Sequence, residues 1–110
     1  MSEQEIDTPI LDLLAGMTAL SLEGQSLDAR STMLARIAAL VATDAPPLSY
    51  ALNLGAAEDL DITPDEIRGV LIAVAPIVGT SRVVAAVGNI VRVKALELAE
   101  LARQEEELSA

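Results

Sequence analysis

The stretch "ITPDEIRGVLIAVAPIVG", residues 62–79, constrains the fold most, because it carries clear signals for both ends of a helix. Thr63 is a favourable N-cap, Pro64 suits the first helical position, and Glu66 completes a capping box with Thr63. The apolar residues that follow fit a helix, and no alternating strand pattern or internal repeat appears elsewhere in the chain. The sequence therefore predicts an all-α fold.

About five helices are predicted over residues 1–110, which form a single domain. In the stretch above, Pro76 should kink or end the helix and Gly79 should close it. The first helix should begin with the cap Thr8 and Pro9 and end at Gly24, and the second should cover residues 26–44 with Ser26 as its cap. The third helix should run from about Pro47 through Leu60. The last helix should run from about Ser81 to Gln104, followed by a frayed acidic tail at residues 105–110.

Apolar residues make up 52% of the chain, yet it contains one Tyr and no Phe or Trp. The mean hydropathy of +0.44 is high for a small soluble monomer, so we expect part of the apolar surface to face another subunit. The run "VVAAVGNIV", residues 83–91, should be buried all round, partly against a neighbour. Met17 and Met33 occupy helical apolar positions and are predicted to lie in the core.

Charge and composition exclude several classes of function. The net charge of −10 disfavours nucleic acid and anionic lipid as partners. The most apolar uncharged run, residues 69–81, is too short to span a bilayer. The acidic start of the chain predicts no secretory signal, so the cytoplasm is the expected compartment. The absence of Cys excludes disulfides, thiol catalysis and thiolate metal sites, and we expect neither metal nor cofactor.

Three segments carry a resemblance to a known family: "LDAR", "ITPDEI" and "VLIAVAPIVGTSRVVAA". In this order and spacing they resemble the carboxymuconolactone decarboxylase and alkylhydroperoxidase-D-like family, over a core of about residues 26–95. The resemblance implies an alkylhydroperoxidase-D-like helical bundle that assembles into trimers or hexamers.

The resemblance also implies where the chemistry of the family would lie. The peroxidase-like branch uses a Cys-x-x-Cys pair, which falls at Ala45 and Leu48, with a relay glutamate at Met33 and a histidine at Leu52. The decarboxylase branch lacks the thiols and keeps the histidine. All four vestigial positions are apolar here, and the chain has no His, so neither set of groups is present. A changed site of this kind suits apolar side chains or a small apolar ligand.

The polar residues near this region are candidate ligand contacts with structural alternatives. Tyr50 is either a packing residue or a ligand contact. Asp44 is either a cap or turn residue or a general acid. Asn53 makes either a local hydrogen bond or a ligand contact, and Arg82 pairs with a carboxylate of the fold or of a substrate.

Three functions remain open from the sequence. The first is a non-catalytic family member that acts as an oligomeric binding or scaffold protein, with itself as partner. The second is a decarboxylase-type enzyme with a displaced acid-base set of Asp44, Tyr50 and Arg82. The third is a helical interaction module whose family likeness is superficial. The absence of His and Cys favours the first over the second, and the long resemblance weighs against the third.

Overall fold

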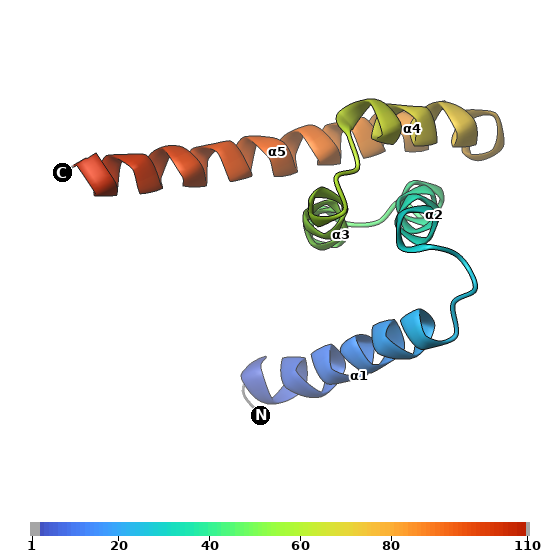
Figure 1. The fold of residues 1–110 in the computed structure, drawn as a ribbon, viewed down its shortest axis with the longest axis horizontal. Helices are drawn as coiled ribbons and strands as arrows, with labels where there is room; N and C mark the ends of the chain where they lie inside the picture. The colour runs from blue at the N-terminus through green and yellow to red at the C-terminus, as the bar shows by residue number, and fades with distance from the viewer. Residues whose placement is uncertain (1–2, 110) are drawn as a thin grey trace.

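The computed structural model describes residues 3–109, with side chains from residue 8 onward. Five helices joined by short connections form this part of the chain, which has no strands, and this confirms the predicted all-α fold. Their bounds are α1 (Glu3–Glu23), α2 (Ala29–Ala42), α3 (Pro47–Asp59), α4 (Pro64–Val78) and α5 (Thr80–Ser109). The helices α2 and α3 lie in the middle, with α1 on one side of them and α4 and α5 on the other (Figure 1).

The boundaries of α3 and α4 follow the local signals. Pro46 is extended, with φ −71° and ψ 162°, and Pro47 opens α3. At the start of α4 the Thr63 hydroxyl accepts the Glu66 backbone N–H at 3.1 Å, while the Thr63 backbone N–H donates to the Glu66 carboxylate at 3.1 Å. Gly79 closes α4 in the positive-φ region, at φ 89°. The predicted capping box is therefore confirmed.

Two prolines lie inside helices, and at one of them the prediction was wrong. The helix α1 begins at Glu3 and continues through Pro9, whereas the sequence predicts a start at Thr8. Proline has a fixed φ that is itself helical, so a helix can extend upstream of it, although the missing N–H removes one hydrogen bond and the ring crowds the carbonyl four residues earlier. For the same reason α4 continues past Pro76 and ends at Val78.

Two other helix ends also differ from the prediction. The N-cap of α2 is Asp28, not Ser26, because the Asp28 carboxylate lies next to the first turn and accepts a backbone N–H there at 2.8 Å. At the other end of the chain, α5 does not stop at Gln104 but continues to Ser109. The tail predicted to fray at residues 105–110 is therefore helical over its described residues, consistent with the high helix propensity of glutamate.

The core lies where α2 packs against α3, α4 and α5. Met33 is 7% exposed and belongs to this core, as predicted, whereas Met17 on α1 is 57% exposed and does not. The buried apolar residues are Met33, Ile37, Val41, Ala45, Tyr50, Leu54, Ala57, Ile62, Ile67, Ala86 and Val93.

The helix α1 stands apart from this core (Figure 1). Within the described residues its backbone packs against no other helix, and Arg36 of α2 reaches it through one hydrogen bond to the Ser21 hydroxyl at 3.0 Å. From residue 8 onward, its large apolar side chains are all at least half exposed: Ile10, Leu11, Leu13, Leu14, Met17, Leu20 and Leu22. Most of the stability of a helix in a protein comes from packing of its apolar face, and the apolar face of α1 lacks such packing within the chain.

The helix α5 carries apolar residues on two sides. Ala86 and Val93 face the core and are 1% and 4% exposed. An outer stripe, consisting of Val84, Val87, Val91 and Leu98, is 44–66% exposed. Residues 83–91 are thus buried on one side by the chain itself, and burial of the other side against a neighbour stays a prediction.

Candidate functional site

The four positions at which the family's chemistry would lie do not form one enclosed site. Met33 lies on α2 and Ala45 in the connection to α3, and both are buried, at 7% and 8% exposure. Leu48 and Leu52 lie on α3 and point to the surface, with 66% and 68% exposure. Met33 and Tyr50 share the core, whereas the exposure of Leu52 places it outside.

The connection between α2 and α3 is a tight turn centred on Asp44. This residue has φ 53°, in the left-handed region that aspartate tolerates better than most residues. The turn is closed by backbone hydrogen bonds, from Asp44 N–H to the Val41 carbonyl at 3.3 Å and from Ala45 N–H to the Leu40 carbonyl at 3.0 Å. Asp44 therefore has a turn function, with its side chain at the surface.

Tyr50 is a core residue, 1% exposed, and one of the largest fully buried side chains. Burial raises the pKa of the Tyr50 phenol, and the negative charge of Asp44 raises it further. A phenol of this kind stays protonated at neutral pH. It can donate a hydrogen bond, but it cannot serve as a base.

Arg82 binds a backbone carbonyl instead of the carboxylate expected from the sequence. Its guanidinium donates to the Ala42 carbonyl, at the last residue of α2. A cation at a helix C-terminus satisfies an unpaired carbonyl and interacts favourably with the helix dipole. Arg82 thus ties the start of α5 to the end of α2.

The two asparagines near this turn are also bound to backbone. Asn53 Nδ2 donates to the Ser49 carbonyl at 2.8 Å, within the same helix. Asn89 Nδ2 lies 3.4 Å from the Ala45 carbonyl and links α5 to the turn. The sequence pattern does not indicate this role of Asn89, because its partner Ala45 lies 44 residues away in the chain.

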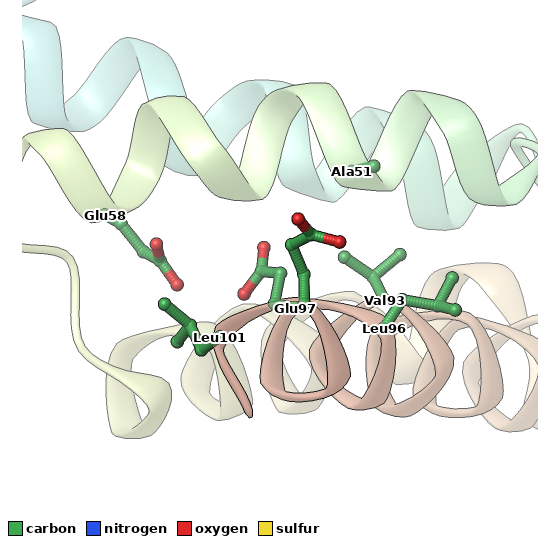
Figure 2. Close-up of a pocket in the computed structure, with 7 residues that line it drawn as sticks. Ala51, Glu58, Val93, Leu96, Glu97 and Leu101 are labelled. Carbon is green, nitrogen blue, oxygen red and sulfur yellow. The ribbon is translucent and has the colours of Figure 1, made fainter. Parts of the chain in front are cut away.

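A second group of ionisable residues lies in a groove between α3 and α5. Figure 2 shows the carboxylates of Glu58 and Glu97 directed into the space between the two helices. The groove has a volume of about 530 Å³. It is lined by Ala51, Glu58, Val93, Leu96, Glu97, Glu100 and Leu101.

Lys94 ties the two helices together at this groove. Its ammonium binds the Glu58 carboxylate and lies 3.3 Å from the Glu97 carboxylate. The hydrogen bond from Lys94 lowers the pKa of Glu58, and the same bond raises the pKa of Lys94. Both groups are therefore charged at neutral pH. No sequence pattern indicates this link, because Glu58 and Lys94 lie 36 residues apart.

No described residues form a cluster of His, Cys, Asp or Glu that could hold a metal ion. The same part of the chain contains no helix long and apolar enough to cross a membrane.

Comparison with known proteins gives one match. The model of the carboxymuconolactone decarboxylase family matches residues 9–89. No protein of curated function matches the chain, and no solved structure does.

Proposed function

This chain belongs to the carboxymuconolactone decarboxylase family, and we propose that it is a non-catalytic member that acts as an oligomeric binding or scaffold protein. The observation that carries the proposal is the replacement of every reactive position by Met33, Ala45, Leu48 and Leu52. A thiolate is the nucleophile in thiol chemistry, and acid-base help requires a group that titrates near neutral pH. Neither kind of group lies at these positions.

The arrangement of the polar residues argues against the alternative, a decarboxylase with a displaced acid-base set. Tyr50 is enclosed in the core, the Asp44 side chain lies at the surface, and the Arg82 guanidinium is engaged by a backbone carbonyl. A general acid or base must reach the reacting proton within hydrogen-bond distance, directly or through one water. Arg82 is thus bound by the fold and Tyr50 is withdrawn from solvent, which leaves the Asp44 carboxylate as the one accessible group of the set.

The exposed apolar surface supports an oligomer. The outer stripe of α5 is exposed, and so are Ile72 and Ile77 of α4, at 66% and 88%. The apolar side of α1 is bare as well. Soluble monomers rarely expose contiguous apolar patches of this kind, so we infer that self-association buries this surface. Family likeness suggests a trimer or hexamer.

The test uses the purified full chain in three measurements. Light scattering should give a multiple of the 11.5 kDa chain mass. Assays with a carboxymuconolactone, and with an organic hydroperoxide plus a dithiol reductant, should give no turnover above a heat-inactivated sample. Lactone turnover that Tyr50→Phe abolishes would establish the displaced acid-base set instead, and a monomer at micromolar concentration would rule out the scaffold role.

A further inference from the structure

A cavity lies between α3, α4 and α5, and neither Asp44 nor Tyr50 lines it. Its volume is about 500 Å³, within the range of small-molecule sites. Much of its wall belongs to the core, since Leu54, Ala57, Ile62 and Ile67 are each 1–9% exposed. The full lining is Leu54, Ala57, Glu58, Ile62, Pro64, Ile67, Ile90, Lys94 and Leu98.

One residue joins this cavity to the groove of Figure 2. Glu58 lines both spaces, so the Glu58–Lys94 ion pair stands between an apolar cavity and an acidic groove. An elongated molecule can therefore place an apolar part in the cavity and a polar part beside the carboxylates.

The charges at this junction favour a cation. Three carboxylates lie there, from Glu58, Glu97 and Glu100, against two cations, Lys94 and Arg103. One net negative charge remains. Lys94 is shared between two carboxylates, and Arg103 is paired with Glu100, so neither cation is free to receive an anionic ligand.

We propose that the cavity binds a small amphiphile with an apolar body and a cationic head. The body lies against Leu54, Ile67 and Leu98, and the head lies beside the carboxylates of Glu58 and Glu97. This inference rests on the proposed binding role and gives it a ligand class.

The first experiment locates binding by isoleucine methyl NMR on the full chain. Decyltrimethylammonium, below its micelle concentration, should shift the methyl signals of Ile62, Ile67 and Ile90, which line the cavity. Ile72 and Ile77 are exposed elsewhere on α4 and should not move. Shifts confined to Ile72 and Ile77, or no shifts at all, would overturn the proposal, since the ligand would then bind other apolar surface or the assembly would fill the cavity.

A second experiment tests the charge of the head by calorimetry. Decyltrimethylammonium, decanol and decanoate share a tail length and differ in head charge. One net charge at about 4 Å in water corresponds to roughly a fivefold change in affinity, so the cation should bind about fivefold tighter than decanol and decanoate about fivefold weaker. Glu58→Gln should remove this order without weakening decanol. If decanoate bound the unmodified chain as tightly as decyltrimethylammonium does, the proposed preference for a cationic head would be contradicted.

Matched variants of α5 complete the test. Leu98 lines the cavity and is 66% exposed, so a tryptophan at this position can fill the cavity without crowding the core. Leu98→Trp should weaken decyltrimethylammonium binding by about tenfold or more, which corresponds to the loss of about two buried methylenes. Leu108→Trp adds the same side chain to the same helix at an 87% exposed position that lines neither the cavity nor the groove, and this variant should bind nearly as the unmodified chain does. Equal losses in both variants would place the ligand outside the cavity.

These readouts are independent of those for the proposed function. Leu98 also belongs to the outer stripe of α5, so the mass of Leu98→Trp is measured beside its binding, and loss of binding at unchanged mass reports on the cavity alone. Turnover of a lactone would end the non-catalytic assignment, while methyl shifts at the cavity would still establish the ligand site.

Discussion

Replacement of Val84 by aspartate tests whether the outer stripe of α5 is an interface. In the single chain Val84 is 64% exposed, so the new carboxylate stays hydrated and should change the stability of the chain by no more than about 0.5 kcal/mol. In an apolar interface the same carboxylate is buried without a partner, which costs about 3–5 kcal/mol. That cost weakens association by roughly 100- to 5,000-fold.

The assay is light scattering over a range of concentrations, combined with thermal unfolding. Val84→Asp should dissociate at concentrations where the unmodified chain remains assembled. Ala99→Asp is the matched control, because it adds the same charge to the same helix at an exposed residue turned about 100° from Leu98, off the stripe. Ala86→Asp is the opposite control, because Ala86 is 1% exposed within the chain and its substitution should unfold any form of the protein.

Two results would refute this reasoning. Val84→Asp with the mass and melting temperature of the unmodified chain would show that Val84 faces solvent in the assembly. Equal dissociation by Val84→Asp and Ala99→Asp would show that added negative charge, rather than burial, separates the subunits.

Three shorter predictions follow from the pKa shifts and the vestigial site. Tyr50 is the only aromatic residue, so alkaline titration of tyrosinate absorbance reports on it alone, and the midpoint should lie above 10.0 in the folded chain; a midpoint at or below 10.0 would contradict its burial. The hydrogen bond from Arg30 lowers the pKa of Glu66 below 4.5, so the stabilising contribution of Glu66 is present above pH 4.5 and is lost as the pH falls through the lowered pKa. The melting temperature should therefore fall more steeply with acid in the unmodified chain than in Glu66→Gln. Parallel curves would show that the bond is not formed in solution. Ala45→Cys/Leu48→Cys should stay without peroxidase turnover until the relay glutamate and histidine are also restored, since acid-base help is worth about 10²–10⁴-fold; equal rates in the double and quadruple variants would show that the relay positions are misassigned.

The helix boundaries that the sequence predicted well depend on residues close together in the chain. Thr63 and Glu66 form their capping box across one turn, and Pro47 opens α3 because of its own ring. Thr8 and Pro9 offered a similar signal, yet α1 extends upstream of them. A local start signal shows that a helix can begin at a residue, whereas the upstream chain decides whether it does.

The partners of the polar residues depended on the tertiary structure. Arg82 and Ala42 lie 40 residues apart, and Lys94 and Glu58 lie 36 residues apart. A helical pattern gives the side of the helix on which a residue lies, but it does not say which other helix will bring a partner there. The cavity between α3, α4 and α5 was missed for the same reason.

The sequence by itself determined that the chain is helical and that the reactive groups of its family are absent, because helix signals are local and composition does not depend on folding. Only the tertiary structure decided which apolar faces are covered. Met17 and Met33 both occupy apolar positions at helical spacing, yet Met33 is 7% exposed and Met17 is 57% exposed. Periodicity defines an apolar face, but burial requires another element to pack on it, and within the described chain α2 has such neighbours whereas α1 does not.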